Sequence, residues 1–178
     1  MIRRQEQHAH NFRYTRGFSL IEMLVYVLIL AVISVFLVYA IISMIRSVVE
    51  ISVSRSILGG AMLSLERITR EAKDAYDINE ATSTLAAHPG RILFLTETES
   101  GATTSILFFI SGDALMMKRG TSTAQSLLPE RVAVENLVFR LATSTLSKSV
   151  KIELELSGAR GSVTRTEQFY GSAQLRNY

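Results

Sequence analysis

The sequence predicts an α+β protein in which one long N-terminal helix is followed by an antiparallel β-sheet. Three features indicate this class: an apolar run over residues 18–45, a helical apolar period that continues to about Asp77, and a period of two from Arg91 to about Leu175. A single helix followed by a run of strands is typical of α+β architecture, in which the sheet packs on the helix.

Length and charge restrict the class of protein. The 178 residues suit one compact domain and one membrane element. The net charge of +3 arises within residues 1–17, because the chain from Phe18 onward has 15 basic and 15 acidic residues. The charge therefore predicts no nucleic-acid partner. The absence of cysteine excludes disulfides and thiolate metal sites.

The apolar run is long enough to cross a bilayer. Met23 to Ile45 is a stretch of 23 residues without a charge. As a helix it would extend about 35 Å, against about 30 Å for the hydrocarbon core. The apolar part of an ordinary secretory signal has only about 7–15 residues. We therefore expect a transmembrane helix that stays in the mature protein.

The arginines predict the orientation of this helix. Four arginines precede it, and only Arg46 and Arg55 follow within the next twenty residues. The positive-inside rule places the N-terminus in the cytoplasm and residues 46–178 outside, so that the chain is a single-pass protein of the cytoplasmic membrane. An uncleaved signal anchor that holds a ligand-binding or partner-binding domain would have the same pattern. An anchored enzyme is a third possibility.

Glu22 distinguishes these alternatives, because a carboxylate near a membrane span needs a partner. At the bilayer centre it costs roughly 2.5–3.5 kcal/mol, and less near the interface. Arg16 could reach toward it from upstream. Cleavage between Gly17 and Phe18 would instead create an α-amine that is largely protonated at neutral pH. Staggered helices could then pair this amine with Glu22 of a neighbour, which would fix their register.

The residues around Glu22 closely resemble the class III signal of type IV prepilins and type II secretion pseudopilins, in the stretch Arg16-Gly17-Phe18-Ser19-Leu20-Ile21-Glu22-Met23-Leu24. The resemblance implies that a prepilin peptidase cuts after Gly17 and methylates Phe18, and that Glu22 guides filament assembly through a salt bridge. It also implies a pilin-like fold. The partners that it implies are the peptidase, other pilins or pseudopilins, an inner-membrane assembly platform and, before assembly, membrane lipid.

Two departures favour a minor subunit. Many major pilins have a proline partway along the apolar helix and a C-terminal disulfide, whereas this chain has Tyr39 there, no proline before Pro89 and no cysteine. The order of helix and sheet and the terminal segment 174–177 resemble the J-type minor pseudopilins and related minor pilins. This second resemblance implies a structural subunit near the tip of a pilus-like or type II secretion filament.

Beyond Ile45 the helical pattern becomes one-sided. Apolar residues recur at spacings of three, four or seven, at Ile51, Leu58, Met62, Leu65, Ile68, Ala72 and Ala75 or Tyr76. We expect this stripe to pack on a globular head, with the helix ending near Asp77. Each residue of Gly59-Gly60 costs about 1 kcal/mol relative to alanine in a helix. The pair predicts either a kink or a close packing contact.

The alternating segments predict the strands of the sheet. They are Arg91–Glu97, Ser105–Ile110, Ala114–Lys118, Leu137–Leu141, Val150–Leu156 and Val163–Leu175. The predicted organisation is thus a removed leader (1–17), an assembly helix (18–45) and an extracytoplasmic head (46–178), in which the helix covers 46–77 and the sheet 91–175.

The remaining motifs predict no catalysis, no cofactor and no metal site. His8 and His10 lie in the leader, and the acidic group of Asp74, Asp77 and Glu80 lacks the spacing of an EF-hand. No nucleophile, phosphate-binding or metalloprotease motif is present. We therefore expect a structural and assembly protein, not an enzyme.

Overall fold

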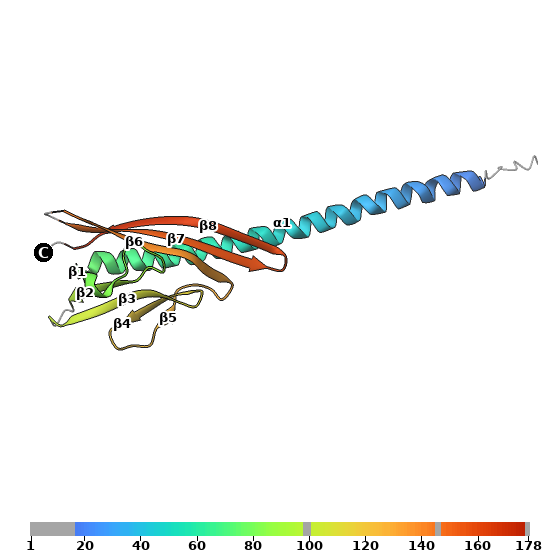
Figure 1. The fold of residues 1–178 in the computed structure, drawn as a ribbon. Helices are drawn as coiled ribbons and strands as arrows, with labels where there is room; N and C mark the ends of the chain where they lie inside the picture. The colour runs from blue at the N-terminus through green and yellow to red at the C-terminus, as the bar shows by residue number, and fades with distance from the viewer. Residues whose placement is uncertain (1–16, 98–100, 145–146, 177–178) are drawn as a thin grey trace, which may run out of the picture. The chain divides into compact units, whose positions relative to one another are not determined.

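The structure is a computed structural model that describes residues 17–97, 101–144 and 147–176. Its elements in chain order (Figure 1) are α1 (Leu20–Asp74), β1 (Asp77–Ile78), the short 3-10 helix η1 (Glu80–Thr82), β2 (Ile92–Glu97), β3 (Thr103–Ser111), β4 (Ala114–Arg119), β5 (Gln125–Ser126), β6 (Val132–Thr143), β7 (Lys148–Arg160) and β8 (Val163–Gln174). The chain divides into two compact units, residues 1–44 and 45–178.

The described part of the first unit is almost entirely helix. Its large hydrophobic side chains are all exposed, from 42% at Val25 to 87% at Leu20. By length and composition, α1 contains a segment able to cross a membrane. A helix that exposes apolar side chains on every side needs lipid or other protein around it.

The second unit contains two antiparallel sheets. One has the strand order β1-β2-β3-β4-β5 and the other the order β6-β7-β8. The α+β fold class is therefore confirmed, as is its pilin-like arrangement of a long N-terminal helix against antiparallel strands. The strands form two sheets and not the one expected. The first sheet ends at β5, which has only two residues. Pro129, which has no N–H to donate to a strand ladder, lies between β5 and β6 and separates the two sheets.

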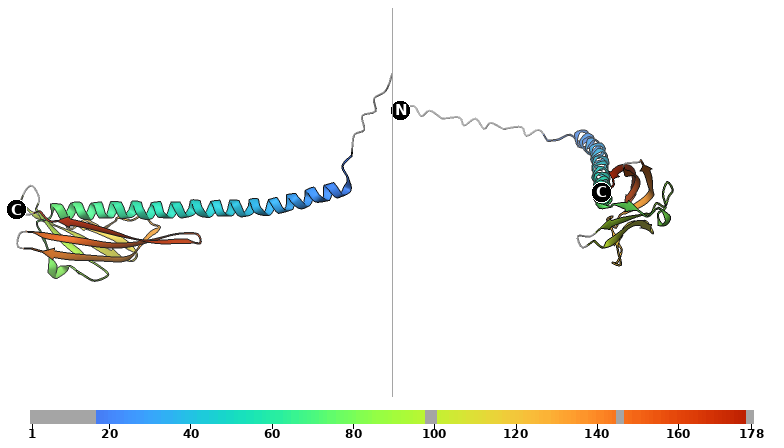
Figure 2. Two further views of the ribbon diagram at one scale, coloured as in Figure 1. Left: turned by 90° about the horizontal axis from the view of Figure 1, so that it is seen from above. Right: turned by 90° about the vertical axis from the view of Figure 1, so that its left-hand side faces the viewer.

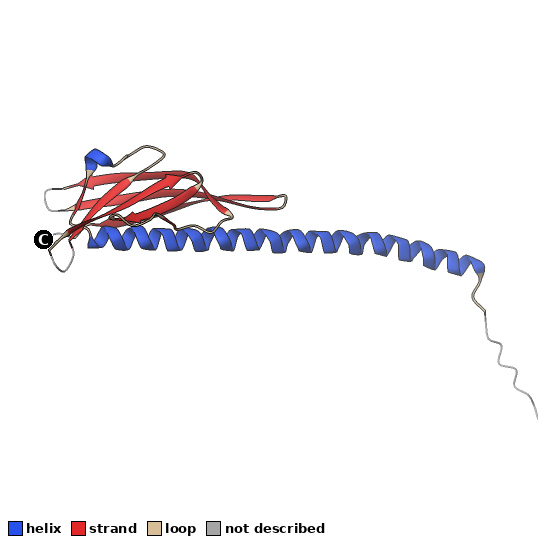
Figure 3. Ribbon diagram, turned by 90° about the horizontal axis from the view of Figure 1, so that it is seen from below, coloured by secondary structure: helices blue, strands red, loops and turns tan. Residues whose placement is uncertain are grey.

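Within this unit, residues 45–74 of α1 lie along both sheets (Figures 2 and 3). The buried positions of α1 are Val53, Ile57, Gly60, Ala61, Ser64, Ile68, Glu71 and Ala72. The predicted stripe is correct for Ile68 and Ala72, but it is wrong for Ile51, Leu58 and Met62, which are 43–61% exposed. Half of these buried positions are small residues, Gly60, Ala61, Ser64 and Ala72, and the side chains of Leu128 and Pro129 lie close to Gly60, whereas larger apolar side chains remain outside.

The end of α1 also differs from the prediction. The helix ends at Asp74 and not near Asp77, because Asp77 pairs with Leu95 of β2. The Tyr76 backbone N–H donates to the Leu95 carbonyl oxygen at 3.0 Å. The first sheet therefore begins at residue 77, before the predicted start at 91. The last strand ends at Gln174, one residue earlier than predicted.

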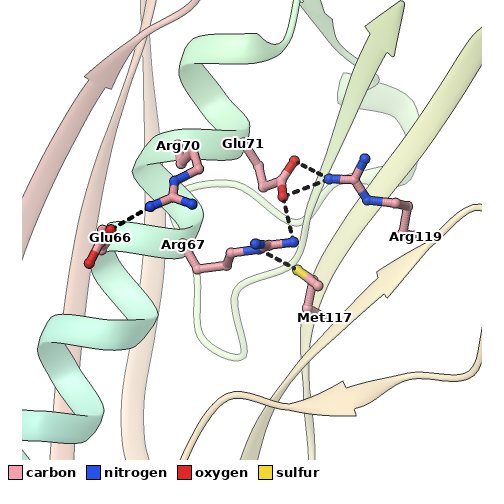
Figure 4. Close-up of polar contacts among 6 residues, drawn as sticks. All are labelled: Glu66, Arg67, Arg70, Glu71, Met117 and Arg119. Atoms are coloured by element: carbon pink, nitrogen blue, oxygen red, sulfur yellow. Dashed lines mark hydrogen bonds and ion pairs between the residues drawn. The ribbon is translucent and has the colours of Figure 1, made fainter. Parts of the chain in front are cut away.

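One buried ion cluster connects α1 to β4 (Figure 4). The Glu71 side chain is 4% exposed, and its two carboxylate oxygens accept from Arg119 Nη2 at 2.7 and 2.8 Å. Arg67 Nη2 lies 3.0 Å from Glu71 Oε1, and Arg67 Nε donates to Met117 Sδ at 3.4 Å. Two positive charges from different elements therefore neutralise one buried carboxylate on the inner face of the helix.

The two adjacent glycines of α1 have different surroundings. A Cβ atom at Gly60 would lie 3.1 Å from Pro129 Cδ and 3.2 Å from Leu128 Cδ2, whereas a Cβ at Gly59 would meet nothing within 4 Å. The continuous helix and this contact favour the packing explanation for Gly60. Gly59 has no such requirement inside the head.

We expect opposite effects from alanine at these two positions. Gly59→Ala should raise the free energy of unfolding by about 0.5–1 kcal/mol, because alanine is the better helix former. Gly60→Ala should lower it by about 1 kcal/mol, because the added methyl group overpacks the contact with Pro129. Urea unfolding followed by circular dichroism measures both values. Equal gains for the two variants would contradict the close contact at Gly60.

Candidate functional site: the N-terminal cleavage and assembly motif

The predicted scissile bond lies immediately before α1. Gly17, Phe18 and Ser19 are not helical, and the Met23 N–H donates to Ser19 O at 3.2 Å as the first turn begins. Gly17 is exposed, and a Cβ atom there would meet nothing within 4 Å. Packing within the chain therefore does not require glycine at this position. Open, non-helical backbone at residues 17–18 is suited to a peptidase.

Glu22 lies one helical turn after this bond and has a partner in its own helix. Tyr26 Oη donates to Glu22 Oε1 at 2.9 Å. The Phe18 ring meets the Tyr26 ring edge-on, with 6.3 Å between centroids and 75° between planes. The three side chains share one helix face because they are spaced by four residues. The site thus combines the residue that is predicted to become N-terminal, a carboxylate and the phenol that orients it.

The sequence analysis did not identify Tyr26, because it considered only cations as partners for Glu22. The i,i+4 spacing from Glu22 was the available signal. A carboxylate has about four acceptor positions, so one bond from a phenol leaves Glu22 able to accept an ammonium group. A hydrogen bond from an ammonium group to this carboxylate would be charge-assisted, and such bonds are roughly twice as strong as hydrogen bonds between neutral groups.

The acidic residues Asp77 and Glu80, which follow α1, pair with a lysine of β7. Lys148 Nζ donates to Asp77 Oδ1 at 2.6 Å and lies 3.6 Å from Glu80 Oε1. The hydrogen bond from Lys148 lowers the pKa of Asp77, and the same bond raises the pKa of Lys148. Within residues 17–97, 101–144 and 147–176, no group of three or more His, Cys, Asp or Glu side chains is placed to hold a metal. His8 and His10 lie outside the described residues.

Comparison with known proteins identifies the motif. Residues 12–38 match the family model described as the prokaryotic N-terminal methylation motif. Searches of curated proteins and of solved structures gave no significant match. The matched range contains Gly17, Phe18, Glu22 and Tyr26, and the chain therefore carries a class III signal of the type IV prepilin kind.

The motif and the fold together support a pilin- or pseudopilin-type subunit. The motif implies processing by a prepilin peptidase and assembly with other pilins. The exposed apolar part of α1 agrees with a membrane-anchored state before assembly.

Proposed function

We propose that this chain is a minor pilin or pseudopilin, a structural subunit near the tip of a type IV pilus-like or type II secretion filament. The observation that carries the proposal is the combination of the open Gly17–Phe18 bond just before α1, Glu22 in the first turn of α1 and an apolar surface exposed on all sides of that helix. These are the features that a helix needs if it is cleaved, leaves the bilayer and enters a bundle of like helices.

Cleavage after Gly17 supplies the missing partner for Glu22. The new amine of Phe18, retained as a cation after methylation, would pair with Glu22 of a neighbouring subunit. Any other stagger would leave a charge unmatched in a low-dielectric bundle. In this mechanism Tyr26 holds the carboxylate on the shared face.

The exposed apolar surface continues past the membrane-length segment. Val48, Ile51 and Leu58 are 43–59% exposed, and Met62 and Leu63 exceed 60%. Monomeric soluble domains rarely expose contiguous apolar patches of this kind. This surface supports contact with neighbouring subunits also along the head. The chain would act by assembly and not as an enzyme.

The retained glutamate also supports a place just below the tip. An incoming subunit offers Glu22 to the amine of a subunit above it, so the topmost subunit has no use for this carboxylate. The cost of desolvating an unpaired charge disfavours Glu22 in a true tip subunit. Another minor pilin would therefore cap this one.

Replacement of Glu22 tests the assembly role. Glu22→Leu should leave cleavage and membrane insertion intact but lower the recovery of this subunit with its minor-pilin partners by at least about tenfold, the effect of a lost charge pair of about 1.4 kcal/mol or more. Tyr26→Phe is the companion variant, since it removes the hydroxyl that orients Glu22 and keeps the carboxylate, and it should lower recovery less than Glu22→Leu does. Co-purification, with processing checked by intact mass, gives the answer.

Equal recovery of Glu22→Leu and wild type would contradict the pairing. Abundance equal to that of the main shaft subunit in sheared filaments would overturn the position near the tip.

A further inference from the structure

Two serines of α1 lie between adjoining depressions at the N-terminal end of the second unit. Ser52 and Ser56 both line a small cleft of about 30 Å³, with Arg131 before β6 and Arg160 at the end of β7. The same serines line a shallower depression of about 500 Å³ together with Arg55. Three arginines from three parts of the chain therefore surround one pair of hydroxyl groups.

The lining of these two depressions carries positive charge only. Among the described residues that line them, three are arginines and none is acidic. Two carboxylates line an adjoining depression that Ile51 and Arg55 also line, and both have other contacts: Glu50 pairs with Arg165, and Glu167 accepts from Ser54 at 3.0 Å. Glu130 lines an adjoining groove that shares Arg131, Gly158 and Ala159 with the small cleft. Basic and acidic residues balance from Phe18 onward, so the positive charge that lines these two depressions is a local feature. It favours an anionic ligand.

The hydrogen-bond donors suit a phosphate. Arg160 Nη1 donates to Ser52 Oγ at 2.9 Å, and Ser56 Oγ donates to the Ser52 carbonyl at 3.1 Å. Since Ser52 Oγ accepts from Arg160, its own hydrogen is available for a ligand. Arginine offers a planar fork of N–H groups that matches phosphate oxygens.

Apolar neighbours indicate where the phosphate comes from. Val48 and Ile51 line the larger depression and are 59% and 54% exposed. Free phosphate gains nothing from apolar neighbours, whereas the glycerol and upper acyl carbons of a phospholipid can pack against these two side chains. Basic residues beside exposed apolar ones are typical of a membrane interface.

The position along the helix fits the same source. Ser52 lies seven residues beyond Ile45, where the predicted span ends, and this is about 10 Å along an α-helix. The headgroup layer extends about 5–8 Å beyond the hydrocarbon core on each side. The long arginine side chains can extend back over that difference.

We propose that Ser52, Ser56, Arg55, Arg131 and Arg160 form a binding site for the phosphate of an anionic phospholipid headgroup. The site would hold the head at the bilayer surface until the helix is extracted. This inference rests on the proposed membrane-anchored state, but it does not depend on cleavage or on the type of filament.

The test uses the full chain, captured in detergent through a C-terminal tag and titrated with three monomeric probes by surface plasmon resonance. The probes are dihexanoyl-phosphatidylglycerol, dihexanoyl-phosphatidylcholine and inorganic phosphate. We expect phosphatidylglycerol to bind tightest. The double variant Arg131→Gln/Arg160→Gln should bind it about 30-fold more weakly, the fold-change for two arginines at about 1 kcal/mol each.

Arg91→Gln is the matched control, because Arg91 is exposed and lines neither depression. It should bind phosphatidylglycerol as the wild type does, and circular dichroism should show that all variants are folded. Equal affinity of the double variant and wild type would overturn the site. Equal affinity for inorganic phosphate and phosphatidylglycerol would overturn the lipid assignment. Intact mass of the same sample reports cleavage separately, so failure of the prepilin function is distinguishable from failure of the lipid site.

Discussion

Replacement of Arg119 by alanine is expected to lower the free energy of unfolding of the head by about 3 kcal/mol. Glu71 is the buried member of the ion cluster, with a side chain that is 4% exposed, and Arg119 contacts both of its oxygens. Loss of Arg119 leaves Glu71 with Arg67 alone. Removal of one partner from a buried pair typically costs about 3–5 kcal/mol, and the partly exposed arginines place this case at the lower end.

Arg70→Ala is the control, because it removes the same kind of side chain from an exposed ion pair on α1. Arg70 pairs with Glu66 at 2.6 Å, but the two side chains are 60% and 65% exposed (Figure 4). An exposed pair of this type contributes less than about 1 kcal/mol. Urea unfolding of the chain from Ser47 onward is a suitable measurement, because every residue of the buried core lies within it. Similar losses for Arg119→Ala and Arg70→Ala would contradict the role of the buried cluster.

The second large effect is expected at Gly17. Gly17→Leu should abolish cleavage while membrane insertion continues, because the apolar segment and the arginines that orient it are unchanged. A Cβ at residue 17 would meet nothing within 4 Å among the described residues, so a folding defect is not expected from this change. The bulk of leucine would instead obstruct the scissile bond in the peptidase. Intact mass of membrane extracts measures the loss, and efficient removal of residues 1–17 from Gly17→Leu would contradict it.

The fold class could be predicted because periodicity reports secondary structure directly. The apolar run and the alternation at Val150–Leu156 each appear as the expected element, and β7 contains the latter. Which helix face is buried could not be predicted from hydrophobicity. Gly60 and Ser64 are both buried, and the space at Gly60 is limited by the side chains of Leu128 and Pro129, which are distant in sequence.

The candidate site divides in the same way. Gly17, Phe18 and Glu22 are identified by local spacing alone, and the family match covers them. Tyr26 could also have been predicted from its spacing of four residues from Glu22, if a phenol had been considered as a partner for the carboxylate. The cluster of Arg55, Arg131 and Arg160 could not be predicted, because these residues come together only when β6 and β7 pack beside α1.

The intact mass of the wild-type chain, purified from membranes that contain active prepilin peptidase, tests the central claim most directly. We expect a mature chain that begins at Phe18 and carries one added methyl group. A chain that keeps residues 1–17 under these conditions would contradict the prepilin assignment and favour an uncleaved membrane anchor.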